Sequence, residues 1–132
     1  MLNESREPGL ESRMTTALRQ TMARHPQFSL HSHRQATHRL DSTVRDFRAI
    51  AISLNASDTV VQYRIEAATT IRLIQKETGG TLLEQEIDAW AEYLVSPDGR
   101  VRENVVARNA AILRLARQFA NKCAALIEIS LL

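Results

Sequence analysis

The chain has 132 residues, of which 44% are hydrophobic and 24% are charged, as is typical of one globular domain that buries a core without disulfides or metals. Its 17 Lys and Arg residues exceed its 15 Asp and Glu residues by two, so charge alone selects neither nucleic acid nor an acidic surface as a partner. Cys123 is the single cysteine, which excludes an intrachain disulfide and fits a reducing compartment.

The N-terminal residues contain no apolar stretch like that of a secretory signal peptide. No uncharged apolar run in the rest of the chain reaches the roughly 18 residues that a membrane-spanning helix requires. We therefore expect a cytoplasmic protein that does not associate with a membrane.

Turn-forming and aromatic residues are scarce, with four Gly, three Pro and an aromatic fraction of 5%, which leaves little material for a sheet. We therefore predict an all-α fold, a single-domain antiparallel helical bundle. Residues 1–8 are expected to form a flexible N-terminus, and residues 9–132 one helical-bundle domain. That domain would hold a four-helix core from residue 32 onward, preceded by an N-terminal helix over about residues 10–24.

The second, third and fourth helices are predicted from capping residues and from apolar positions three or four residues apart. Ser32 with Gln35, and Thr81 with Glu84, fit the pattern S/T-x-x-E/Q that begins many helices. The three predicted helices cover about residues 32–54, 58–78 and 81–94.

The longest predicted helix runs from Arg100 to about Ser130, a stretch without Gly or Pro. At 100° per residue its apolar side chains cover about half of the circumference, which is wider than the seam of a two-helix coil. We interpret this helix as the centre of the bundle, in contact with several neighbours, and expect Phe119 and Leu126 to belong to the core.

One polar stripe is a candidate basic face. Its residues would line the outer side of the second predicted helix, where they could contact a phosphate backbone or an acidic partner. The alternative is a solvated face on which Asp41 bridges its neighbours. The residues of the candidate basic face are Arg34, His38, Asp41, Arg45 and Arg48.

Histidines and acidic residues raise two further hypotheses about chemistry. Three histidines could share a metal ion, but His33 and His38 would point to opposite sides of the predicted helix, and no carboxylate or thiolate lies nearby in the sequence. Three acids of the fourth predicted helix, Glu84, Asp88 and Glu92, lack matching inward acids on a second helix. We therefore predict no metal site, no cofactor and no catalytic residues.

A candidate interface is predicted on the last helix and at the end of the chain. Asn109 falls within the apolar arc of the helix, where a polar amide often fixes register or partner choice. Apolar residues at the end of a soluble chain either fold into the core or dock on another protein. The other residues of this candidate interface are Leu126, Ile127, Ile129, Leu131 and Leu132.

From these features we expect a non-catalytic helical-bundle interaction protein, such as an adaptor, chaperone or inhibitor. Its partner would be another protein or a second copy of itself, as a homodimer. The alternative is a nucleic-acid-binding accessory protein that uses the Arg-rich N-terminal helices, and a second alternative is a small helical enzyme.

Overall fold

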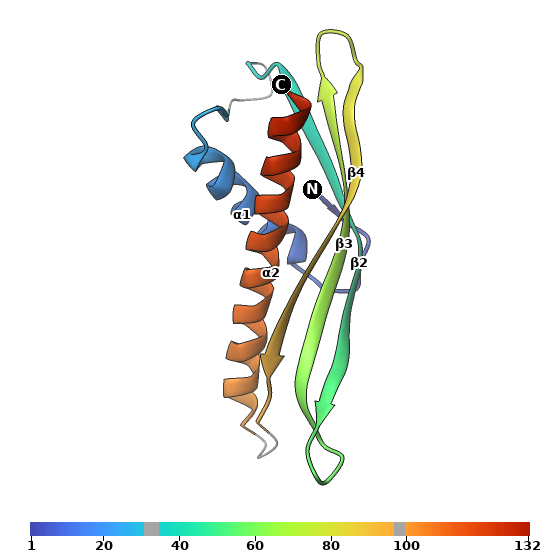
Figure 1. Ribbon diagram of the computed structural model, residues 1–132, viewed down its shortest axis with the longest axis vertical. Helices are drawn as coiled ribbons and strands as arrows, with labels where there is room; N and C mark the ends of the chain where they lie inside the picture. Colours follow the sequence, from blue (N-terminus) through green and yellow to red (C-terminus); the bar gives the residue numbers. More distant parts are fainter. Residues whose placement is uncertain (31–34, 97–99) are drawn as a thin grey trace.

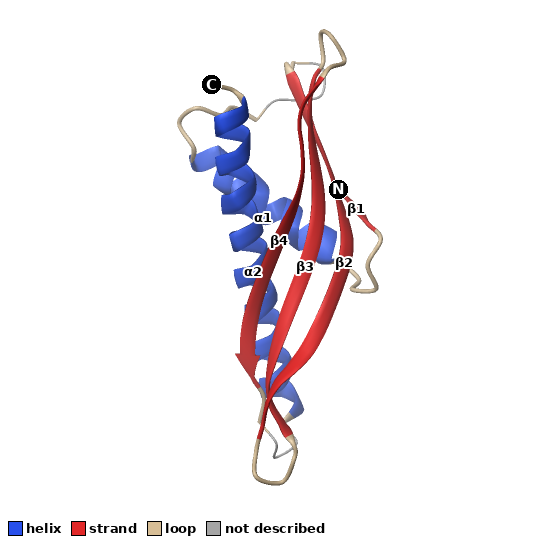
Figure 2. Ribbon diagram, turned by 45° about the vertical axis from the view of Figure 1, so that its right-hand side comes forward, coloured by secondary structure: helices blue, strands red, loops and turns tan. Residues whose placement is uncertain are grey.

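The computed structural model describes residues 1–30, 35–96 and 100–132, and in this part of the chain two helices cover one face of a four-stranded sheet (Figures 1 and 2). The prediction of an all-α bundle is therefore wrong. In chain order, the elements are β1 (Leu2–Asn3), α1 (Leu10–Arg24), β2 (His38–Leu54), β3 (Val60–Gln75), β4 (Thr81–Leu94) and α2 (Val101–Ser130).

The sheet has the strand order β1-β2-β3-β4. The short β1 is parallel to β2, and the three long strands form an antiparallel meander in which Thr69 lies opposite Val44 and Ile87. The long strands and α2 run together along the long axis of the molecule, and α1 crosses the C-terminal half of α2 (Figure 1).

The second, third and fourth predicted helices are strands in the structure. The prediction failed because the spacing of their apolar residues does not distinguish a helix from a strand. Residues four apart share one face of a helix and also one face of a strand, so Leu40 and Val44 fit both. The alternation of β3 is decisive: Ile65, Ala67, Thr69, Ile71 and Leu73 are all buried, while the residues between them are not. This period of two is typical of a strand with one covered face.

Two tight turns join the long strands, and both contain a residue with positive φ. Asp58 has φ 58° in the first turn, where the Oδ1 atom of Asn55 accepts hydrogen bonds from the amides of Ser57 and Thr59 at 2.9 and 3.0 Å. Gly79 has φ 71° in the second turn. Gly79 thus supplies to this hairpin a left-handed conformation that glycine adopts without strain.

The helices α1 and α2 are present where the sequence predicts them, but they pack on a sheet rather than on other helices. Phe119 and Leu115 of α2 are fully buried in one core cluster with Met14 of α1 and Ile71 of β3. Cys123 is also buried there, and burial raises the pKa of its thiol to about 12. The wide apolar arc of α2 therefore reflects simultaneous contact with α1 and the sheet.

The N-terminal segment, expected to be flexible, is held against β2 and α2 at several points. The amide of Glu4 donates to the carbonyl oxygen of Val44 at 2.8 Å, and Glu4 also pairs with Arg45 at 2.9 Å. Glu7 accepts a hydrogen bond from Arg108 of α2 at 2.9 Å. Both partners of this second ion pair are half-buried, so water screens it less than it would screen an exposed pair.

Candidate functional site

A cavity of about 620 Å³ lies between the C-terminal half of α1, the connector that follows it, the beginning of β2 and the end of α2. These parts are far apart in the sequence but converge at one end of the molecule, where the C-terminus also lies (Figure 1). We call this space the upper cavity.

The connector after α1 is fixed to the end of α2 by His25. Its Nε2 atom lies 3.2 Å from a carboxylate oxygen of Glu128. Its ring stacks on that of Phe28, with centroids 4.4 Å apart, and the Phe28 amide donates to the His25 carbonyl oxygen at 3.2 Å. These contacts hold Phe28 in the wall of the upper cavity.

The lining of the upper cavity is mainly apolar at depth. Leu18 of α1, Leu73 of β3 and Ile127 of α2 are each less than one-tenth exposed. At the mouth, Leu30 is 53% exposed and Leu131 is 43% exposed. Large apolar side chains thus continue from the core to solvent along this cavity.

Polar groups surround the mouth. Arg19 of α1 lines it, and His38 lies at the start of β2 with its Nδ1 atom 2.8 Å from the Thr37 hydroxyl oxygen. Within the described part of the chain, no Asp or Glu lines the upper cavity. The arrangement combines an apolar interior with a basic entrance, which suits an anionic ligand that has a hydrocarbon portion.

The residues of the candidate basic face do not form a continuous basic stripe. Arg34 lies outside the described residues. His38 contributes to the upper cavity, and the other three lie along β2, each in an ion pair. Asp41 pairs with Arg39 at 3.1 Å, Arg45 with Glu4 at 2.9 Å, and Arg48 with Glu66 at 3.0 Å.

The residues that suggested metal or acid chemistry are separated. His31 and His33 lie outside the described residues, so a site that includes them is not described by the structure. The three acids of the fourth predicted helix lie on β4, on the sheet face that is turned away from the helices. There Arg64 lies 4.0 Å from the Trp90 ring centroid and 3.9 Å from a carboxylate oxygen of Glu92.

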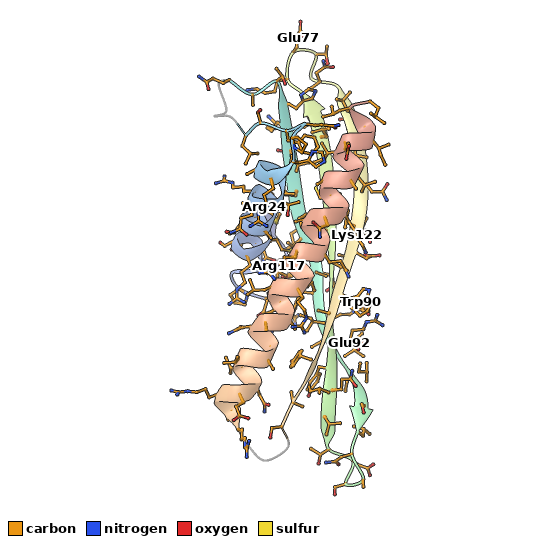
Figure 3. All side chains as sticks on the ribbon, turned by 60° about the vertical axis from the view of Figure 1, so that its left-hand side comes forward. Arg24, Glu77, Trp90, Glu92, Arg117 and Lys122 are labelled. Carbon is orange, nitrogen blue, oxygen red and sulfur yellow. The ribbon has the colours of Figure 1, made fainter. Side chains whose placement is uncertain are left out.

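Helix α2 also covers the free edge of β4, which sequence reasoning missed. Lys122 donates to the carbonyl oxygen of Asp88 at 2.7 Å, and Arg114 donates to that of Glu92 at 2.6 Å. Between them, the Trp90 amide donates to the side-chain oxygen of Gln118 at 2.8 Å. Figure 3 shows Lys122 on α2 beside the strand that bears Trp90 and Glu92. The spacing 114, 118, 122 is the signal, since it places three polar side chains on one side of a helix.

The candidate interface is divided between buried and exposed residues. Ile127 is 2% exposed, Leu126 packs against the core, and Asn109 is half-buried. Ile129 and Leu132 are 66% and 96% exposed, so these two offer apolar surface to a partner. Whether they contact one stays a prediction.

Solved structures of bacterial proteins share this fold. A putative lipoprotein from Caulobacter crescentus superposes with a TM-score of 0.58 and 13% identity, over 92% of this chain and 82% of that chain. A hypothetical protein from Chlamydia trachomatis has a TM-score of 0.63 and 10% identity, over 97% and 92%. The rare lipoprotein B from Shewanella oneidensis has a TM-score of 0.56 and 14% identity, over 98% and 96%. At these identities the likeness establishes the fold alone.

The fold is thus one that bacterial lipoproteins use, with two helices on one face of a mixed sheet. The model of the LptE family, described as lipopolysaccharide-assembly, matches residues 2–124. This chain therefore belongs to the LptE family. No curated protein sequence matches the chain.

Family membership corrects the predictions of location and function. LptE proteins are lipoproteins on the periplasmic side of the outer membrane, so the predictions of a cytoplasmic protein and of no membrane association are wrong. The helical-bundle adaptor, and with it the nucleic-acid-binding and small-enzyme alternatives, is replaced by a role in outer-membrane lipopolysaccharide assembly. Among the described residues, neither helix is long and apolar enough to span a membrane.

The expectation of a protein partner agrees with the family at a coarse level, because LptE proteins bind other proteins.

Proposed function

We propose that this protein acts in lipopolysaccharide assembly at the periplasmic side of the outer membrane, where it binds lipopolysaccharide and a partner protein. The observation that carries the proposal is the family match over residues 2–124, nearly the whole chain. The upper cavity supports it, since an apolar interior with a basic entrance is complementary to a phosphorylated, acylated lipid.

The lipid-binding part of the proposal can be tested with purified protein and lipopolysaccharide. We expect saturable binding when the protein is sedimented with lipopolysaccharide aggregates, and weaker binding at high salt because phosphate–Arg contacts are screened. Vesicles of phosphatidylglycerol, which are also anionic, are the control for non-specific attraction. Binding to lipopolysaccharide no stronger than binding to these vesicles at physiological salt would contradict the proposal.

For the protein partner, or for a second copy in a homodimer, the exposed end of α2 is the surface that we propose. Ile129 and Leu132 are apolar and largely exposed, so covering them would remove unfavourable contact with water. Changing both residues to Asp should leave thermal stability nearly unchanged. The same change should lower the sedimentation coefficient of any self-associated form, and an unchanged distribution from a self-associating parent would exclude this surface.

A further inference from the structure

The depth of the upper cavity indicates which part of a ligand it can hold. Its volume of about 620 Å³ lies in the range of roughly 300–1,000 Å³ that is usual for small-molecule pockets. Leu18, Leu73 and Ile127 provide methyl groups and no hydrogen-bonding atoms from their side chains. A polar group placed among them would lose its hydrogen bonds to water, whereas a hydrocarbon chain has none to lose.

The mouth of the cavity gives a second indication of a hydrocarbon ligand. Leu30 and Leu131 are about half exposed and flank the entrance together with the partly buried Met22 and Phe28. A chain that enters between them would cover apolar surface that is now in contact with water. Met22 has an unbranched, flexible side chain, which can adapt to an irregular chain.

The charge around the entrance indicates an anionic head group. Arg19 lines the cavity with an exposed guanidinium that makes no ion pair with any residue in the described part of the chain. The acid closest to this region along α2, Glu128, is already engaged by His25. A guanidinium matches the planar geometry of a carboxylate or two oxygens of a phosphate.

We infer that the upper cavity binds one acyl chain of lipopolysaccharide and that Arg19 contacts an anionic group at the head of that chain. This inference rests on the proposed function, since it assigns one portion of the proposed ligand to named residues. The lipid portion of lipopolysaccharide carries several acyl chains and phosphates on a disaccharide. The site would therefore shield one of the chains from water while the phosphorylated sugar remains at the entrance.

A series of fatty acids tests the hydrocarbon part of this inference with the unmodified protein. The probes are decanoate, dodecanoate and tetradecanoate, each measured by displacement of a fluorescent fatty acid. Burial of each CH₂ group contributes about 0.8 kcal/mol, which corresponds to about a four-fold gain in affinity per CH₂. Affinities that do not depend on chain length would overturn the inference.

A cavity-filling variant tests the location. Ala36 lines the upper cavity from the connector before β2, so Ala36→Trp should occupy its volume and weaken tetradecanoate binding at least ten-fold. Ala23→Trp is the matched control, because Ala23 is exposed on α1 and does not line the cavity. Circular dichroism verifies that both variants fold. Equal tetradecanoate affinities for the two folded variants would place the lipid elsewhere.

A pair of arginine variants tests the head-group contact. Arg19→Gln should weaken tetradecanoate and lipopolysaccharide binding by about ten-fold, because it removes the charge at the entrance. Arg24→Gln is the control, since Arg24 is exposed at the end of α1 (Figure 3) and is not among the residues that line the cavity. Equal losses in the two variants would mean that the effect is general electrostatic attraction, and would overturn the assignment to Arg19.

Lipopolysaccharide and phosphatidylglycerol vesicles, used as competitors, separate the inference from the proposed function. If the protein binds lipopolysaccharide and Ala36→Trp binds it equally well, the inference fails while the proposed function stands. If lipopolysaccharide does not bind at all, the proposed function fails. Displacement of tetradecanoate by lipopolysaccharide but not by phosphatidylglycerol is the expected result. Equal displacement by the phospholipid would overturn the assignment to lipopolysaccharide.

Discussion

Replacement of Phe119 by alanine is the most direct test of how the helix layer and the sheet form one core. Phe119 is 0% exposed and belongs to the same cluster as Met14 of α1 and Ile87 of β4. Removing its ring leaves a cavity that the surrounding elements can fill only partly. Phe→Ala changes at such positions cost about 3–5 kcal/mol.

This loss should lower the melting temperature by about 10–20 °C in a domain of this length. Thermal unfolding followed by circular dichroism measures it, with Leu132→Ala as the control because Leu132 is 96% exposed. Leu126→Ala should fall between the two, since Leu126 is only partly buried. A decrease of less than about 3 °C for Phe119→Ala would refute the packing argument, because no buried ring is removed so cheaply from a well-packed core.

Three further predictions follow from local geometry. Burial raises the folded-state pKa of Cys123 from 9.0 to about 12, so the thiol stays neutral in the fold and the free energy of unfolding should decrease as the pH rises from about 9 towards 12. Unfolding in guanidinium chloride at several pH values should show a smaller decrease for Cys123→Ala. Equal pH dependence of the two proteins would contradict the burial of the thiol. Gly79→Ala should destabilise the β3–β4 hairpin by about 1 kcal/mol, because φ is 71° there; Gly80→Ala, where φ is not positive, should cost less in the same titration. Glu7→Gln should weaken the contact with Arg108 and increase hydrogen exchange in residues 2–8 more than in β4. Unchanged exchange would mean that β1 and the contacts of Glu4 hold the segment without this ion pair.

Local sequence patterns determined several features of this protein correctly. The stretch from Arg100 to Ser130 has no Gly or Pro, and its apolar arc repeats with the helical period, so α2 was predictable within a residue or two. Helix α1 was predictable for the same reason.

Tertiary structure decided the identity of the segments between the two helices. Apolar residues four apart, such as Leu83 and Ile87, lie on one face in either a helix or a strand. Trp90, three residues further, separates the two cases: it would share that face in a helix, but in β4 it lies on the opposite face. These segments form strands rather than helices because β2, β3 and β4 satisfy one another's backbone hydrogen-bonding groups. This stabilisation depends on residues that are distant in the sequence.

The upper cavity was even less predictable from the sequence, because its walls are brought together only by the tertiary structure. Leu18 of α1, Leu73 of β3 and Leu131, just after α2, are each more than 50 residues apart in the sequence, and no local pattern connects them. The hydrogen bonds from α2 to the edge of β4 are of the same kind, since they require the strand to exist before a helix can cover it. Periodicity alone determines which residues of one segment share a face, whereas the packing of the whole chain determines what that face meets.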